Sequence, residues 1–302
     1  MLILLYPSSV QANDYFDVTG YLEIGSNELD PVIYPELRLT TFKLGDQLSV
    51  QTTQPDGDGV FSFNNVIGGT GFGYIISAEY GDVTYTYESD FPIKETPVKL
   101  LIFENINSSE SLHVISHSMI VSMEDFESRT INVIELVEIE NIGDRTFVPD
   151  LRQPGKMDLL RFSLPSGVEN LDVQSSMRGG QILQVDRGFA ITTPVKPGIH
   201  EIAYNFDWIY SGNSVSFDHG LSYGAEKFRV MLENGVGLAR GTDLAFIDDI
   251  TLGNKEYSLY ETDAMDKGSR VLLELENLPT PSLWRQVQDL ALTATFRASI
   301  IA

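Results

Sequence analysis

Few residues of the sequence have the types and spacing that catalysis requires. The histidines are His113, His117, His200 and His219, there is no cysteine, and neither a Gly-x-Ser-x-Gly elbow nor a His-Glu-x-x-His zinc motif occurs. Nucleophilic catalysis needs a serine or cysteine beside a base and an orienting group. On a strand, His113 and His117 share one face but lie about 13 Å apart, too far to bind one metal ion. We interpret them as polar residues of a solvated strand and predict that the protein is not an enzyme.

The acidic residues offer two other chemistries. The 43 Asp and Glu residues include enough carboxylates for the catalytic pair of a glycoside hydrolase, but nothing singles out two of them. Asp56 and Asp58 belong to an Asp-Gly-Asp-Gly run that resembles the start of an EF-hand calcium loop, whose remaining ligands are missing. We expect this run to be a turn in a protein without a cofactor. Calcium bound by Asp56 and Asp58 is the alternative.

A row of aromatic residues is the remaining candidate site. Phe206, Trp208 and Tyr210 alternate along one predicted strand and therefore share a face. If this face is exposed, the rings could stack on sugars, with hydrogen bonds from Asp207 or Asn213. If it is buried, the rings are part of the core. The first alternative predicts a carbohydrate-binding module, and the second predicts no site here.

The charge balance limits the partners. The 43 acidic and 20 basic residues give a net charge of −23, and no basic cluster interrupts the acidity. Affinity for nucleic acids depends on Lys and Arg that neutralise phosphates, so we exclude nucleic-acid partners. Anionic membrane surfaces are disfavoured for the same reason. The partners that remain are a protein or a polysaccharide at the cell surface.

Both ends of the chain carry features of targeting. Residues 1–12 comprise an apolar run followed by Val10 and Ala12, which resemble the third-last and last positions before a signal-peptidase site. We interpret them as a signal-peptide remnant of an extracytoplasmic protein, with an N-terminal strand as the alternative. Residues 280–302 have helical spacing but contain Arg285, Asp289 and Arg297, whereas a spanning helix takes about 20 apolar residues. We expect a short C-terminal helix, and membrane attachment only through an anchor outside this chain.

Alternation of apolar and polar residues predicts an all-β protein. Segments 17–24, 37–42 and 131–141 have the period of two that is typical of half-buried strands. Turns rich in Pro and Gly separate such segments at short intervals. The pattern predicts two tandem antiparallel β-sandwich domains, at residues 13–102 and 112–279, joined by a polar linker.

The first of these domains resembles a known family. Val18 and Gly20 form a Val-x-Gly opening strand, residues 56–63 read Asp-x-x-Gly-x-Phe-x-Phe, and Tyr-Gly-Asp at residues 80–82 marks the turn of an aromatic hairpin. Together they look like a carboxypeptidase regulatory-like domain. The resemblance implies a seven-stranded sandwich of the transthyretin or collagen-adhesin-B type. Such domains accompany secreted enzymes, adhesins and starch-binding-like modules, so the resemblance implies a fold more firmly than a function.

The second domain carries a resemblance of its own. Segments 140–147, 160–171 and 186–198 are similar to uncharacterised extracytoplasmic proteins of bacteria. In those proteins a regulatory-like domain precedes this β-domain, and a C-terminal membrane helix often follows. The resemblance implies a non-catalytic surface or envelope protein that acts in structural display or protein interaction. A carbohydrate-binding module is the second hypothesis, and a glycoside hydrolase is the third.

Overall fold

The chain is almost entirely β-structure. The computed structural model describes residues 14–26, 33–151 and 158–282, and within these ranges the single helical element is a 3-10 turn, η1 (Ser109–Ser111). The predicted all-β class is therefore confirmed. Contacts divide the chain into two compact units, Met1–Asn105 (unit 1) and Ile106–Ala302 (unit 2). The predicted signal-peptide remnant at 1–12 and the helical segment from residue 283 onward lie outside the described residues.

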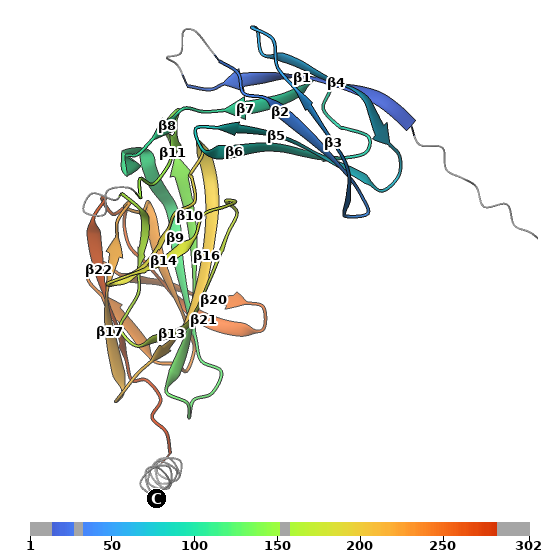
Figure 1. Ribbon diagram of the computed structural model, residues 1–302. Coiled ribbons are helices and arrows are strands. Elements are labelled where there is room, and N and C mark those ends of the chain that lie inside the picture. Colours follow the sequence, from blue (N-terminus) through green and yellow to red (C-terminus); the bar gives the residue numbers. More distant parts are fainter. Residues whose placement is uncertain (1–13, 27–32, 152–157, 283–302) are drawn as a thin grey trace, which may run out of the picture. The chain divides into compact units, whose positions relative to one another are not determined.

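Unit 1 is a sandwich of a four-stranded and a three-stranded sheet (Figure 1). The strand orders are β3-β2-β5-β6 and β4-β1-β7. The strands are β1 (Asp14–Ile24), β2 (Leu37–Lys43), β3 (Asp46–Thr53), β4 (Val60–Gly68), β5 (Phe72–Tyr80), β6 (Val83–Asp90) and β7 (Val98–Ile102). The ring of Phe16 on β1 packs edge-on against that of Tyr74 on β5, with centroids 5.6 Å apart, so the two sheets share one core.

The hairpin between β5 and β6 shows how local sequence sets the fold of unit 1. Gly81 and Asp82 connect the two strands, and both have positive φ, 57° and 62°. Two consecutive positive φ values match the right-handed twist of the flanking strands, and glycine and aspartate tolerate them. The register that follows places Tyr74, Ile76 and Tyr85 in the core.

Unit 2 has a large sheet covered by two small ones (Figure 1). The large sheet has the order β13-β16-β10-β9-β18-β21-β20, and the small sheets are β12-β15-β14 and β17-β22-β19. Its strands are β9 (Leu112–Ser122), β10 (Thr130–Asn141), β13 (Val168–Ser175), β16 (Gly198–Ile209), β18 (Lys227–Glu233), β20 (Ala245–Leu252) and β21 (Lys255–Glu261). The small sheets contain β12 (Leu160–Ser163), β14 (Ile182–Val185), β15 (Gly188–Ile191), β17 (Ser214–Leu221), β19 (Leu238–Gly241) and β22 (Ser269–Glu276), and β8 (Asn105–Ile106) pairs with β11 (Thr146–Phe147).

Aromatic side chains fill the space between these layers. Tyr204 of β16 packs against Phe189 of β15 with ring centroids 4.9 Å apart, and Trp208 of β16 lies 6.1 Å from Phe217 of β17. All four rings are buried. Burying one large apolar side chain contributes about 1.5–3 kcal/mol, so this seam holds the large sheet to both small sheets.

The strand pairing differs from the predicted antiparallel arrangement at two ladders. β1 pairs with β7 in parallel, and β9 pairs with β18 in parallel. The neighbouring ladders of the same sheets, such as β1 with β4 and β9 with β10, are antiparallel. Alternation of buried and exposed residues is the same in both kinds of ladder, so the sequence pattern does not distinguish them.

Within the described ranges no helix has the length and apolarity needed to cross a bilayer.

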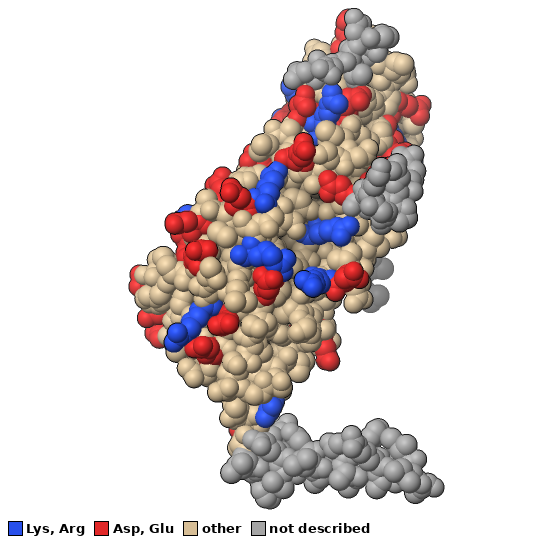
Figure 2. Space-filling model, turned by 90° about the vertical axis from the view of Figure 1, so that its left-hand side faces the viewer, with Lys and Arg blue, Asp and Glu red and all other residues tan. Residues whose placement is uncertain are grey.

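Charged side chains of both signs are mixed over the face shown in Figure 2. Some charged side chains of unit 2 form ion pairs, among them Lys227 and Arg229 with Glu261, at 2.5 and 2.8 Å. Exposed pairs of this kind contribute about 0–1 kcal/mol each, so they affect solubility more than they determine the fold.

Candidate functional site

Four polar side chains meet in the core of unit 2. Glu135 of β10 and Tyr204 of β16 are direct cross-strand neighbours and point inward. His117 comes from β9, on the other side of β10, and His219 comes from β17 in a facing small sheet. We call these four side chains the His-Glu-His-Tyr cluster. It joins three strands of the large sheet to the opposite layer.

A β-bulge brings His117 into this cluster. The ladder between β9 and β10 shifts where Glu138 pairs with Ser116 and the next residue pairs with Val114. The extra residue reverses the alternation, because successive side chains on a strand point to opposite faces. His113 therefore keeps 32% of its side chain exposed and contacts Glu226, whereas His117 keeps only 5%. The prediction that both histidines lie on a solvated face is wrong for His117.

The polar atoms of the cluster converge on one carboxylate oxygen. His117 Nε2 lies 2.5 Å from Glu135 Oε2, and His219 Nε2 lies 3.0 Å from the same atom. The Tyr204 hydroxyl donates a hydrogen bond of 2.6 Å to it. Glu135 Oε1 and His219 Nδ1 are also buried but have no hydrogen-bond partner. The cluster thus has three groups around one oxygen and two unsatisfied polar atoms nearby.

The cluster shifts the ionisation of its members. Burial raises the pKa of Glu135, but the attraction of His219 and the hydrogen bonds from both histidines outweigh this effect and bring its pKa to about 2. Burial lowers the pKa of His117 more than the neighbouring carboxylate raises it. Burial and the carboxylate both raise the pKa of Tyr204. At neutral pH the cluster therefore combines a charged Glu135 with a neutral His117 and a neutral Tyr204.

Aromatic rings seal the cluster from solvent. Phe228 lies with its ring centroid 5.3 Å from that of His117 and 5.0 Å from that of His219, and Phe217 lies 4.8 Å from His219. Glu135 is fully buried, and the side chains of the two histidines expose 5% or less. A substrate has no access to these groups in this structure. Their chemistry is that of holding a proton or a cation.

The sequence contains a signal for this cluster that motif searching misses. Along β10 the inward positions carry Ile131, Val133, Glu135 and Val137, so one glutamate occupies an apolar register. His219 likewise takes an inward position of β17, between buried Phe217 and Leu221. A buried charge is costly unless it is paired, so such a position indicates a partner elsewhere in the fold. The sequence alone does not identify that partner.

The aromatic row at the end of β16, with Tyr210 just after the strand, faces the core. Phe206, Trp208 and Tyr210 expose 1%, 2% and 4% of their surfaces. The rings belong to the core, which was the alternative interpretation, and they form no exposed surface on which a sugar could stack. Asp207, on the opposite face, accepts hydrogen bonds from Asn132 and Asn170 and so ties β10 and β13 to β16. Asn213 is exposed in the turn before β17.

Asp56 and Asp58 lie in an exposed turn of unit 1. Asp56 Oδ1 accepts hydrogen bonds from the backbone N–H groups of Asp58 and Val60, at 3.0 and 2.9 Å. One oxygen of the proposed calcium ligand is therefore occupied in closing the turn. Within the described residues, one group of three side chains has the mutual spacing of metal ligands, and it is His117, Glu135 and His219.

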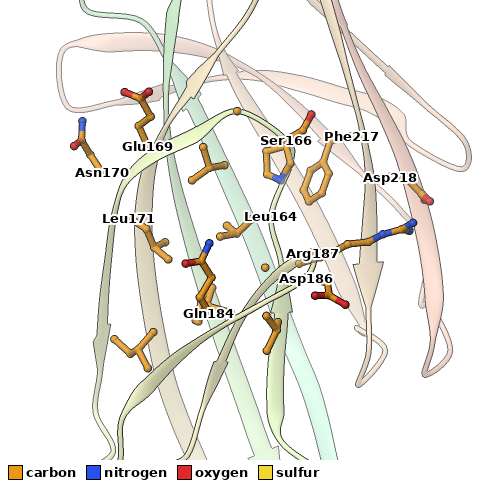
Figure 3. A pocket seen from close by; sticks show the side chains of 18 of the residues that line it. Leu164, Ser166, Glu169, Asn170, Leu171, Gln184, Asp186, Arg187, Phe217 and Asp218 are labelled. Carbon is orange, nitrogen blue, oxygen red and sulfur yellow. The ribbon is translucent and has the colours of Figure 1, made fainter.

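An open cleft lies on the surface of unit 2 (Figure 3). It has a volume of about 740 Å³ and lies between the start of β13 and the β14–β15 hairpin. Its lining combines apolar side chains with carboxylates, amides and two arginines. Representative residues are Leu164, Leu171, Ile182, Glu169, Gln184 and Arg187. Asp218, at one end, forms an ion pair of 2.7 Å with Arg270.

Comparison with known proteins gives no family. No protein-family model matches the chain, and no curated protein sequence matches it. Among solved structures, an M1 zinc metallopeptidase from Deinococcus radiodurans is similar, with a TM-score of 0.35 and 12% identity over 55% of this chain and 42% of that chain. A two-domain M1 zinc metallopeptidase bound to L-tryptophan has the same TM-score and identity over 43% of its length.

A weaker likeness is to a β-glucuronidase of glycoside hydrolase family 2. It has a TM-score of 0.13 and 9% identity, over 87% of this chain and 38% of that one. The chain thus spans less than half the length of each of these enzymes. Likenesses at this level do not bear on function.

Proposed function

We propose that the protein is a non-catalytic surface or envelope protein that binds an extended segment of another protein in the cleft of unit 2. The observation that carries this proposal is that the cleft lies between the last strands of two sheets. β13 ends the large sheet, and β14 ends the sheet β12-β15-β14. An extended peptide can add to such an edge, because the edge presents backbone N–H and C=O groups without a strand partner.

The edge of β14 offers the better pairing surface of the two. Its hairpin with β15 turns at Asp186 and Arg187, and Val185 pairs with Gly188 next to the turn. Residues that close a tight hairpin exchange hydrogen bonds, so the backbone N–H of Gln184 points to the free edge. β13, in contrast, is bulged after Glu169, which interrupts regular pairing.

The lining favours a polypeptide over a sugar. Leu171 and Ile182 expose 37% and 51% of their surfaces at the cleft and can receive apolar side chains of a bound strand. The aromatic residues of the lining, Phe189 and Phe217, expose only 0% and 6%. Carbohydrate recognition usually relies on an exposed ring, and neither of these residues offers one. The expected ligand is therefore an extended segment with apolar residues at alternate positions.

The same geometry supports a role without catalysis. Glu135 and the two histidines that contact it are sealed in the core. Asp218 in the cleft is bound to Arg270 by an ion pair. A general acid or base must reach the reacting group through a hydrogen bond, which a sealed residue does not do.

For unit 1 we propose a regulatory-like domain that presents unit 2 at the cell surface. The four-stranded and three-stranded sheets of its described residues support this proposal, as do the motif residues Val18, Gly20 and Asp56 at strand and turn positions. The acidity of the chain, with a net charge of −23, suits an exposed protein that must stay soluble.

The test is selection from a library of displayed random peptides on the purified full chain. The selected peptides are synthesised and titrated calorimetrically into the wild type and into two variants of one residue, Gln184→Ala and Gln184→Pro. Alanine keeps the backbone N–H, and proline removes it. We expect Gln184→Ala to bind like the wild type and Gln184→Pro to bind about 10-fold more weakly, the equivalent of one strong hydrogen bond.

A panel of cell-wall and storage polysaccharides serves as the second arm of the experiment. Saturable heat with a polysaccharide, and none with any peptide, would contradict the proposal and favour a carbohydrate-binding module. Selected peptides that bind both Gln184 variants equally would place the site away from β14. Hydrolysis of a polysaccharide would show that the protein is an enzyme.

A further inference from the structure

We propose that the His-Glu-His-Tyr cluster is a structural zinc site, with His117, Glu135 and His219 as ligands and Tyr204 as the fourth. This inference is independent of the proposed binding function, because the cluster lies in the core and not in the cleft.

The donor set has the chemistry that zinc prefers. Structural zinc sites are four-coordinate, and imidazole nitrogen and carboxylate oxygen are common ligands. One ligand atom from each of His117, Glu135 and His219 lies within 4.8 Å of the other two. The Tyr204 hydroxyl adds a fourth oxygen, 2.6 Å from Glu135 Oε2 and 3.5 Å from His117 Nε2. Calcium and magnesium take mainly oxygen ligands, so two imidazoles select against them.

Two of the distances between the donor atoms are close to those of a tetrahedral site. Bonds of about 2.0–2.2 Å to zinc place neighbouring ligand atoms about 3.3–3.5 Å apart. The separation of Tyr204 oxygen and His117 Nε2, 3.5 Å, already agrees, and that of His219 Nε2 and Glu135 Oε2, 3.0 Å, is slightly short. Two contacts of Glu135 Oε2, that of 2.5 Å with His117 Nε2 and that of 2.6 Å with the Tyr204 hydroxyl, must each lengthen by about 0.7–1 Å when zinc binds.

One feature of the cluster is unexplained without a cation. Glu135 is fully buried, and three groups surround its Oε2. Its other oxygen, Oε1, has no hydrogen-bond partner. A buried polar atom in this condition is costly. A cation at the centre of the cluster would give this oxygen a partner.

The position of the cluster indicates what the ion would do. His117, Glu135 and Tyr204 belong to adjacent strands of the large sheet, and His219 belongs to the opposite layer. A metal ion bound by all four cross-links the two layers of unit 2. Because binding requires the folded arrangement, its free energy adds to the stability of the fold.

The experiment begins with the full chain unfolded in denaturant with a chelator, then refolded with or without zinc, because a sealed site loads most readily during folding. The bound metal is counted by mass spectrometry, and cobalt replaces zinc to give the visible absorption of a tetrahedral ion. We expect one zinc per chain. The melting temperature should rise by about 10 °C when free zinc exceeds its Kd about 1,000-fold.

Glu135→Gln and His219→Gln remove one ligand each, and His113→Gln is the matched control on β9. We expect the first two to bind zinc at least about 100-fold more weakly, and the control to bind like the wild type. A refolded wild type that binds neither zinc nor cobalt would overturn the inference. Binding that survives both ligand substitutions would overturn it as well, because the metal would then lie elsewhere.

Discussion

Removing the hydroxyl group of Tyr204 tests the electrostatics of the buried cluster. The substitution Tyr204→Phe keeps the ring, which packs against Phe189, and removes the 2.6 Å hydrogen bond to Glu135 together with the longer contact of 3.5 Å with His117. Hydrogen bonds to charged groups contribute about 1.5–3 kcal/mol, more than the 0.5–1.5 kcal/mol of neutral pairs. We expect the free energy of unfolding of unit 2 to fall by about 2 kcal/mol. A loss of this size lowers the melting temperature of a domain of about 150–250 residues by about 4–8 °C.

The assay is urea denaturation and thermal unfolding of the metal-free protein, followed by circular dichroism and tryptophan fluorescence. Tyr210→Phe is the matched control. It makes the same change at the residue that follows β16, but its hydroxyl donates to the uncharged carbonyl of Pro279. The control should cost about 1 kcal/mol or less. If Tyr204→Phe costs no more than Tyr210→Phe, Glu135 is not held as a carboxylate by converging donors, and the electrostatic account of the cluster is refuted.

Three further predictions concern the core and the cleft of unit 2. Because the pKa of His117 in the folded state is lowered from 6.5, the unfolded chain binds more protons than the folded chain below about pH 6.5. The free energy of unfolding, measured by urea titration, should therefore decrease as the pH is lowered, by up to about 1.4 kcal/mol per pH unit. His117→Gln should flatten this dependence. Gly188→Ala should cost about 3 kcal/mol in the same assay, because its Cβ would lie 1.9 Å from the carbonyl oxygen of Phe162, whereas Gly179→Ala, with nothing within 4 Å, should cost about 1 kcal/mol. Trp208→Ala should destabilise the protein by about 3–5 kcal/mol, since the ring is 2% exposed; an unchanged stability would show that the ring is not core.

The fold class could be predicted because it depends on local pattern. Segment 131–141 alternates as a half-buried strand does, and it forms most of β10, Thr130–Asn141. The hairpin at Gly81 and Asp82 likewise follows from the tolerance of these residues for positive φ. Which strands become neighbours is not local. The parallel pairing of β9 with β18 joins segments separated by more than one hundred residues, and no turn sequence specifies it.

The candidate site was the harder part to predict from the sequence. Alternation placed Phe206, Trp208 and Tyr210 on one face, but whether that face is covered depends on the small sheets, which come from other segments. The position of His117 depends on a bulge in β9 that shifts its face by one residue. Glu135 and His219 meet because β10 and β17 belong to facing layers. No spacing along the chain encodes that meeting, although a glutamate in an apolar register indicates that some partner exists.

Backbone amide hydrogen exchange, read residue by residue by NMR, tests the central claim most directly. The exchange rates of Ile182–Val185 are compared in the free protein and in the presence of a saturating peptide selected from the display library. If an extended segment pairs with the edge of β14, the amide of Gln184 exchanges at least about 10-fold more slowly in the complex, because it gains a hydrogen bond of roughly 1.4 kcal/mol. If the peptide binds while exchange at Gln184 stays unchanged, strand addition at β14 is contradicted, and with it the proposed function of the cleft.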